Sequence, residues 1–314
     1  MNNTDDQFVH QSVLLQESVA ALAIKPEGVY VDGTFGRGGH SRAILAQLGA
    51  GGRLYAIDRD PQAIAEGERL AAQDSRFQIA YAPFSDLRRC CEQWGIVGKV
   101  NGLLLDIGVS SPQLDDASRG FSFRNDGPLD MRMNPNEGQS AAQWLAQAKE
   151  EDIANVLWQY GEERFSRRIA KAIVLARQEQ SITRTKQLQE IVAKAHPRWE
   201  KGKDPATRAF QAIRIFINRE LDELEKALAE SLDVLVEGGR LVVISFHSLE
   251  DRMVKQFIQR ESKGEEFPLD LPIQGRAAEG RLQRIGKMIK PGQTELQENP
   301  RARSSCLRVA EKRF

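Results

Sequence analysis

The sequence is poor in cysteine and has no long apolar run. Three cysteines in 314 residues, two of them adjacent at Cys90 and Cys91, make neither a disulfide framework nor a metal knuckle. Reduced thiols are typical of cytosolic proteins, so we expect a cytoplasmic location. No apolar run is long enough to cross a bilayer, and residues 1–7 lack the basic start and apolar stretch of a signal peptide. We therefore expect no membrane association.

The sequence also lacks net charge and any metal-binding pattern. No cluster of His, Cys and Asp has the spacing of metal ligands, so we predict no metal site. The 44 basic and 44 acidic residues cancel, which argues neither for nor against nucleic acid. However, residues 160–219 hold 14 Lys/Arg against 6 Asp/Glu, and residues 276–313 hold 10 against 4. Either segment alone is equally compatible with a solvated helix face, but together they favour a basic face and a polyanionic partner.

What the sequence does contain is a strand that runs directly into a glycine-rich turn. Strand formers from Val29 onward end at Asp32, and His40 opens a helical pattern after the turn. The turn contains Gly33, Gly36, Gly38 and Gly39. A strand, a glycine loop and a helix N-terminus together make a site for a nucleotide-like ligand.

Each of the next two apolar strands leads to a residue that is a candidate for ligand binding. Residues 53–58 end at Asp58, about where such folds bind a ribose diol, and a carboxylate can accept both hydroxyls. Asp58 is alternatively a helix cap ahead of Pro61, although Asp60 suits that role better. The next strand leads to Phe84, for which a place beside a bound purine and a place in the core are both open.

The fourth strand, at residues 100–106, ends at Asp106 and opens into a loop of small residues. Its continuous apolar run predicts a strand that is covered on both faces. Because the carboxyl ends of parallel strands line the ligand crevice, we expect Asp106 where a substrate meets the first ligand. The loop contains Ser110, Ser111, Pro112 and Gln113.

The alternation of strands and helices stops after Gln113. A long polar loop follows at residues 115–138, and its apolar anchors favour an ordered functional loop. Helical patterns then extend to about residue 200 and end in a polar link, residues 201–205. The anchors are Phe121, Phe123, Leu129 and Met131. We predict a Rossmann-like, doubly wound α/β domain at residues 1–114 and 206–314, with an inserted helical substrate-recognition domain at 115–205.

Beyond the insertion, the pattern predicts one long helix from Thr207 to about Val236. A fifth strand then leads to His247, and two last strands are expected at residues 281–289 and 304–313. We expect His247 to be structural or to contact substrate.

A glycine turn with acids at the ends of two further strands is the layout of S-adenosylmethionine-dependent methyltransferases. A nicotinamide dinucleotide fold prefers Gly-x-Gly-x-x-Gly, and Gly36-Arg-Gly-Gly-His40 has no third glycine in register. Two other classes compete with this one: a nicotinamide oxidoreductase, and a non-catalytic RNA-binding assembly factor that retains the cofactor fold. The intact glycine loop, Asp58 and Asp106 argue against the non-catalytic assembly factor.

Several longer motifs carry a resemblance to a known family. They include Asp32-Gly-Thr-Phe-Gly-Arg-Gly-Gly-His-Ser41, Leu104-Leu-Asp-Ile-Gly-Val-Ser-Ser-Pro-Gln113, Asp126-Gly-Pro-Leu-Asp-Met-Arg-Met133, Ser245-Phe-His-Ser-Leu-Glu-Asp251 and Asn299-Pro-Arg-Ala-Arg-Ser-Ser305. With them the sequence closely resembles the ribosomal RNA small subunit methyltransferase H (MraW) family over nearly its whole length. The resemblance implies a class I methyltransferase fold with a helical insertion and S-adenosyl-L-methionine as cofactor. It also implies methylation of a cytidine exocyclic N4 in 16S rRNA of the small ribosomal subunit, near the decoding centre.

Carried over position by position, the resemblance implies a set of cofactor contacts. They fall on Gly38, Gly39, His40, Asp58, Phe84, Asp106 and Gln113. Gln113 is open to contact with either cofactor or substrate. The resemblance leaves open whether the chain works alone or as a homodimer.

Exocyclic-amine methyltransferases often carry an Asp/Asn/Ser-Pro-Pro-aromatic loop after the fourth strand. Ser110-Ser-Pro112-Gln113 keeps part of that pattern and lacks the aromatic residue. We expect Ser110, Ser111 or nearby carbonyls to accept the amine protons, which makes Ser110, Ser111 and Pro112 the catalytic candidates. The residue that stacks on the target base stays open among Phe121, Phe123 and Phe246.

Overall fold

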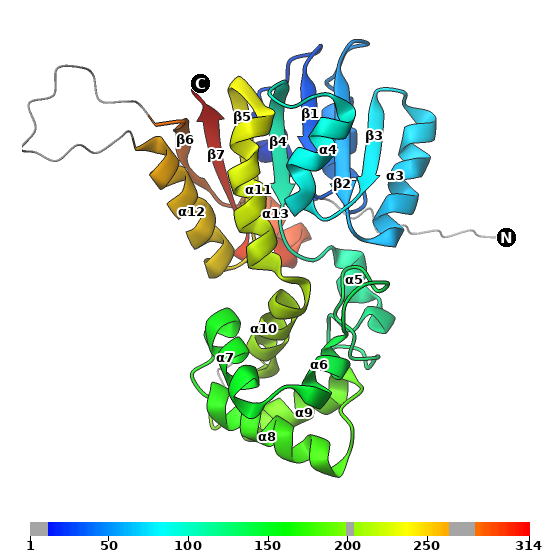
Figure 1. Ribbon diagram of the computed structural model, residues 1–314, viewed down its shortest axis with the longest axis vertical. Coiled ribbons are helices and arrows are strands. Elements are labelled where there is room, and N and C mark those ends of the chain that lie inside the picture. The colour runs from blue at the N-terminus through cyan, green and yellow to red at the C-terminus, as the bar shows by residue number, and fades with distance from the viewer. Residues whose placement is uncertain (1–11, 199–203, 264–279) are drawn as a thin grey trace, which may run out of the picture. The chain divides into compact units, whose positions relative to one another are not determined.

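The computed structural model describes residues 12–198, 204–263 and 280–314, and the chain forms two compact units (Figure 1). Unit 1 comprises residues 1–108 and 223–314, and unit 2 comprises residues 109–222. Residues 1–7, where we expected no signal peptide, and residues 201–203 of the predicted polar link lie outside the described residues.

A seven-stranded sheet in the order β3-β2-β1-β4-β5-β7-β6 forms the centre of unit 1. Its strands are β1 Val29–Asp32, β2 Arg53–Asp58, β3 Phe77–Tyr81, β4 Val100–Asp106, β5 Leu235–Ser245, β6 Leu282–Ile289 and β7 Cys306–Lys312. The first five pair in parallel, whereas β7 runs antiparallel to both β5 and β6. This confirms the predicted doubly wound α/β fold and its two last strands. The strand order reverses at β1, so a ligand crevice is expected outside the carboxyl ends of β1 and β4.

Helices cover both faces of the sheet because successive residues of each strand are buried on opposite sides. On β4, Leu104 packs with α1, α2 and α3, whereas Leu103 and Leu105 pack with α4, α11 and α12. Figure 1 shows α4, α11 and α12 on the near face. The helices of this unit are α1 Leu15–Ala21, α2 Gly39–Leu45, α3 Pro61–Gln73, η1 Phe84–Asp86, α4 Leu87–Trp94, α11 Glu220–Val234, which starts in unit 2, α12 Ser248–Ser262, α13 Gln293–Glu298 and η3 Pro300–Ser304.

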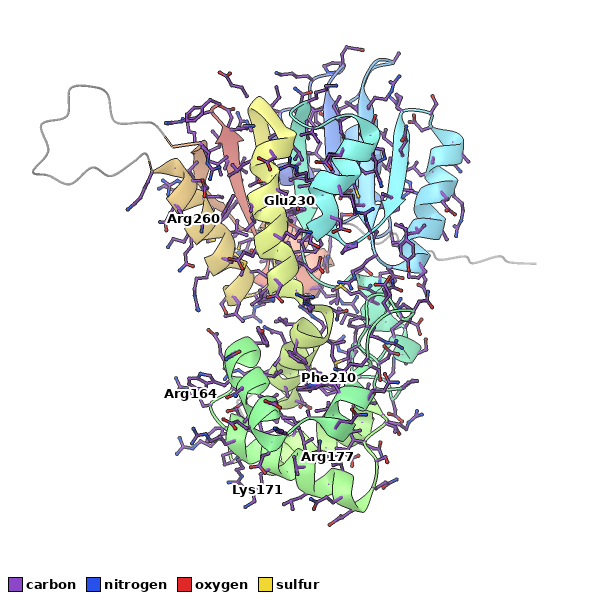
Figure 2. All side chains as sticks on the ribbon, in the orientation of Figure 1. Arg164, Lys171, Arg177, Phe210, Glu230 and Arg260 are labelled. Carbon is purple, nitrogen blue, oxygen red and sulfur yellow. The ribbon has the colours of Figure 1, made fainter. Side chains whose placement is uncertain are left out.

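Unit 2 is helical and has its own apolar core. Its helices are α5 Ser111–Asp115, η2 Ala117–Arg119, α6 Ala141–Gln147, α7 Glu150–Gly161, α8 Ser166–Glu179, α9 Thr185–Ala195 and α10 Ala206–Asn218. Leu129 and Met131 of the long loop are buried in this core, as expected of anchors. In Figure 2, Phe210 lies among these helices, whereas Arg164 and Lys171 point away from them. None of the helices in the described parts of either unit is both long and apolar enough to cross a membrane.

The long helix predicted from Thr207 to Val236 is wrong. It is two helices, α10 and α11, with Arg219 between them in the left-handed conformation at φ 53°. The side chain of Asn218 holds this break, because it accepts a hydrogen bond from Met133 N and donates one to Met131 O, both at 2.7 Å. Since α10 packs with α7 and α9 in the core of unit 2, this unit extends beyond the 115–205 of the sequence prediction.

Candidate functional site

The loop after β1 is fixed by the buried side chain of Asp32. Its Oδ2 accepts a hydrogen bond from Ser41 Oγ at 2.6 Å, and its Oδ1 accepts one from Thr34 N at 3.1 Å. Thr34 Oγ1 in turn accepts a hydrogen bond from Asp106 N at 2.6 Å. Burial raises the pKa of Asp32 above its usual range, while the hydrogen bond from Ser41 opposes that shift. The carboxylate therefore ties β1 to α2 and, through Thr34, to the end of β4.

Sequence reasoning did not assign roles to Asp32, Thr34 and Ser41. The signal that was available is an Asp at a strand end with Thr two residues later, the pattern of an Asx turn.

The two predicted glycine contacts occupy crowded positions at the start of α2. Gly38 lies at φ 75°, which an L side chain rarely adopts, and a Cβ there would lie 2.7 Å from the Phe35 ring. A Cβ on Gly39 would lie 2.0 Å from Ser12 Oγ. Gly39 thus has a packing reason of its own, namely the close approach of the N-terminal segment.

His40 is buried and faces Asp106. Its Nε2 lies 3.2 Å from the carbonyl oxygen of Val13, and its Nδ1 lies 3.7 Å from Asp106 Oδ2. Because a carbonyl oxygen can only accept, the proton of the neutral ring is on Nε2, and the lone pair of Nδ1 faces the carboxyl group. Burial lowers the pKa of His40, which favours this neutral ring.

Asp106 stands at the end of β4 with an unsatisfied oxygen. Its side chain is 23% exposed, yet Oδ1 is buried and has no hydrogen-bond partner among the described residues. Burial raises the pKa of Asp106 well above its usual range, and the negative charges of Asp32 and Glu250 add to the shift. Asp106 and His40 together therefore form an acceptor pair that a cationic donor would satisfy.

Asp58 lies at the end of β2 and contacts the glycine loop. Its Oδ2 accepts a hydrogen bond from Gly36 N at 2.7 Å, and its Oδ1 accepts one from Asp60 N at 2.8 Å. Burial raises its pKa to about 6. Each carboxylate oxygen has a second lone pair, so the group can still accept from a diol. The cap of α3 is Asp60, whose Oδ1 accepts from Gln62 N at 3.0 Å, so the alternative of a cap at Asp58 is excluded.

Phe84 begins η1 and adjoins the same loop. Its Cβ would lie 3.8 Å from a Cβ placed on Gly33, and its ring is partly buried against the core. Six of the predicted cofactor residues thus lie in the glycine loop and the first turn of α2, at the last residues of β2 and β4, or in η1 after β3. They are Gly38, Gly39, His40, Asp58, Phe84 and Asp106.

The remaining predicted residues belong to unit 2, at the start of α5. Ser110 is the N-cap residue of α5, and Gln113 Oε1 accepts a hydrogen bond from Ser110 N at 2.9 Å. Ser111 and Gln113 are buried, while Pro112 is half-buried. Gln113 therefore has a structural role in capping this short helix.

The three candidate stacking aromatics have different surroundings. Phe123 packs edge-on against Phe210, with ring centroids 4.8 Å apart, and Phe121 is only 6% exposed beneath the guanidinium of Arg119. Phe121 is thus buried, whereas Phe123 in unit 2 and Phe246 in unit 1 are both half-buried. His247 is the N-cap residue of α12, where its Nδ1 accepts a hydrogen bond from Glu250 N, and the alternative of a substrate contact stays a prediction.

The mostly parallel sheet has a glycine loop after β1 and carboxylates at the ends of β1, β2 and β4. With this strand order it is the class I methyltransferase fold. The chain belongs to the MraW methylase family, whose family model matches residues 7–313.

Curated relatives cover the chain almost completely. It is similar to the protein named ribosomal RNA small subunit methyltransferase H of Nitrosococcus oceani, with 60% identity over 304 residues and 96% of each chain covered. The protein of the same name from Coxiella burnetii is 57% identical over 303 residues, covering 96% of this chain and 98% of that one. Among solved structures, an rRNA methylase from Streptococcus thermophilus matches at 12% identity and a TM-score of 0.42, covering 98% of this chain and 99% of that one.

Proposed function

We propose that this protein transfers a methyl group from S-adenosyl-L-methionine to N4 of one cytidine in 16S rRNA, near the decoding centre. The observation that carries the proposal is the buried, unsatisfied Oδ1 of Asp106 beside His40, with Asp58 at the end of β2. The names of the curated relatives support the choice of small-subunit rRNA as substrate.

The residues of the site fit this cofactor better than a pyrophosphate. When bound, S-adenosylmethionine supplies an electrophilic methyl group on a sulfonium. Asp106 and His40 Nδ1 would accept from its ammonium group, and Asp58 would accept from its ribose diol. A pyrophosphate would face the carboxyl groups of Asp58 and Asp106 at the strand ends, and the nearby Arg42 is already held by Glu66 and the carbonyl of Arg37.

The loop residues would act on the substrate. Cytosine N4 is a weak nucleophile because its lone pair is delocalised into the ring. An acceptor for the amine protons localises that lone pair, and positioning supplies much of the remaining rate. We assign the acceptor role to Ser110, Ser111 or a neighbouring carbonyl, with Pro112 shaping the loop.

Unit 2 is proposed to recognise the rRNA. Four cations follow α7 or lie on α8, all exposed and without a partner among the described residues: Arg164, Arg167, Arg168 and Lys171. The indole of Trp158 in α7 is 59% exposed in the same unit. Cations with an exposed aromatic ring are the features with which proteins hold unpaired nucleotides.

Labelled methyl transfer tests the proposal. Small ribosomal subunits that lack the modification are incubated with labelled S-adenosylmethionine, and the rRNA is digested to nucleosides for mass spectrometry. We expect N4-methylcytidine at one position, and an Asp58→Asn variant should reduce the rate at limiting cofactor. Label on another base, or in another RNA only, would contradict the substrate assignment.

A binding measurement separates the alternative classes. We expect S-adenosylmethionine to bind and NAD(H) not to bind. Binding of NAD(H) alone would favour an oxidoreductase, and subunit binding without methyl transfer would favour an assembly factor.

A further inference from the structure

A second site lies in unit 1 between α12 and the edge of the sheet. It is a shallow, solvent-open pocket. Its lining residues come from α12, β6 and β7, whereas the glycine loop and Asp58 stand at the ends of β1 and β2. The candidate cofactor site does not use any of these lining residues.

A bulge in the edge strand opens this pocket. Ile285 pairs with Val309 and Ile289 pairs with Leu307, so three residues of β6 lie opposite the single residue Arg308 of β7. The bulge begins at Gly286, whose φ of 66° is one that L side chains rarely adopt. Edge bulges of this kind interrupt strand pairing and re-aim the neighbouring side chains.

The lining combines cations with an apolar floor. Lys255, Arg284 and Lys287 are exposed and have no carboxylate partner among the described residues. Among the described residues, the lining contains no Asp or Glu, and Arg308 is held by Asp251 through hydrogen bonds of 2.7 and 3.0 Å. The apolar part is made of Ile258, Ile285, Met288 and Val309, and Met288 is 40% exposed.

We propose that this pocket holds one nucleotide of the rRNA substrate outside the methylated base, with its phosphate on Lys255, Arg284 and Lys287 and its base against Met288. Three unpaired cations around an apolar floor match a polyanion with flat apolar parts, which is the chemistry of an unpaired RNA segment. The proposal rests on the proposed function for the identity of the RNA.

A different role is known for cations on an edge strand. Lysines there prevent pairing with the edges of other sheets and so limit aggregation. That role predicts no change in RNA binding when the charges are reversed, because glutamates also protect an edge strand, so the two interpretations give different results.

Charge reversal tests the proposal on the full chain. The variant Arg284→Glu/Lys287→Glu is compared with Lys25→Glu/Lys99→Glu, which changes the charge equally at exposed positions near the amino ends of β1 and β4. In methylation of small subunits, we expect the pocket variant to raise KM on the order of tenfold. Its kcat and its affinity for S-adenosylmethionine should stay at the wild-type value.

The salt dependence gives a second readout. In the pocket variant only, the slope of log affinity against log salt should become shallower by about 0.7 for each phosphate that the protein no longer neutralises. Equal KM values for the two variants would overturn the proposal. If the wild-type protein does not methylate subunits, the proposed function fails, and direct binding of subunits still tests the pocket.

Crosslinking identifies the occupant. A photoreactive side chain at position 288 in place of Met288 should crosslink to 16S rRNA in a subunit mixture, at a nucleotide other than the methylated cytidine. Crosslinks to ribosomal protein only, or to a second copy of this chain, would overturn the assignment to RNA.

Discussion

His40 Nδ1 lies 3.7 Å from Asp106 Oδ2, and the opposite ring nitrogen lies 3.2 Å from the carbonyl oxygen of Val13. The carbonyl places the ring proton on Nε2, so that the neutral ring turns a lone pair toward the carboxyl group. Two acceptors that face each other without a donor are unfavourable unless a proton or a cation lies between them. The raised pKa of Asp106 favours a proton at this place, and in the proposed complex the ammonium of the cofactor would be the donor.

Substitution of Asp106 should therefore weaken binding only of ligands that carry the ammonium group. We expect Asp106→Asn to weaken binding of S-adenosylhomocysteine by about 10- to 100-fold, the effect of a hydrogen bond to a charged group. Methylthioadenosine has the adenosine part without the ammonium, so its affinity should not change. Calorimetry with the two ligands measures this, and Asp58→Asn serves as the control that should weaken both. An equal loss for both ligands in Asp106→Asn would contradict the assignment.

The affinity for the ribose should depend on pH through Asp58. Because burial raises its folded-state pKa from 3.8 to about 6, the carboxyl group is protonated below that pH and accepts poorly from a diol. We expect the affinity for methylthioadenosine to rise as pH increases through about 6, and the Asp58→Asn variant to lose this dependence. A pH-independent affinity in the wild-type protein between pH 5 and 8 would exclude Asp58 as the diol acceptor.

The same pKa shift has a consequence for stability. Between 3.8 and about 6 the folded protein binds a proton at Asp58 that the unfolded chain does not bind. The contribution of this group to the free energy of unfolding therefore falls as pH rises through that range. Comparing urea midpoints of the wild type and Asp58→Asn at pH 5 and pH 7.5 isolates the contribution, which should favour the variant at the higher pH.

The hydrogen bond from Ser41 to the buried Asp32 should stabilise unit 1. Ser41→Ala leaves a buried carboxylate oxygen without its donor, and we expect the free energy of unfolding to fall by about 1–3 kcal/mol. Urea denaturation measures the change. Ser75→Ala, at an exposed position of the same unit, should stay within about 0.5 kcal/mol of the wild type.

Substitution of the two loop serines should change the rate of methyl transfer without changing the affinity for the cofactor. If one of them accepts the amine protons, Ser110→Ala or Ser111→Ala lowers kcat while the affinity for S-adenosylmethionine stays unchanged. Ser118→Ala, in η2 of the same unit, is the matched control. Full kcat in both loop variants would remove the serines from the mechanism and leave the backbone carbonyls.

Binding of rRNA should fall steeply with salt because the proposed contacts are to phosphates. Reversing Arg167 and Lys171 on α8 should weaken subunit binding and reduce the salt slope, whereas the Lys25→Glu/Lys99→Glu control should do neither. Filter binding between 50 and 200 mM salt measures both quantities. A flat response in the wild type would remove the argument for a basic face.

The sequence by itself determined the α/β fold and the places of the main acids. Apolar runs that end in Asp58 and Asp106 are local signals, because a buried parallel strand needs continuous apolar residues and its polar end marks the crevice. The cap at Asp60 was also local, since it depends on the proline that follows. The motifs added the family, which the match over residues 7–313 confirms.

Only the tertiary structure decided how those residues are held. Asp32 contacts Ser41, nine residues away, and Thr34 reaches the backbone of Asp106 in another strand, and periodicity carries no information about such pairs. The helix break at Arg219 could not be predicted from the sequence, because apolar residues continue at helical spacing on both sides of it. The pocket beside β6 depends on a register shift against β7, and strand pairing at long range is decided by packing rather than by either strand alone.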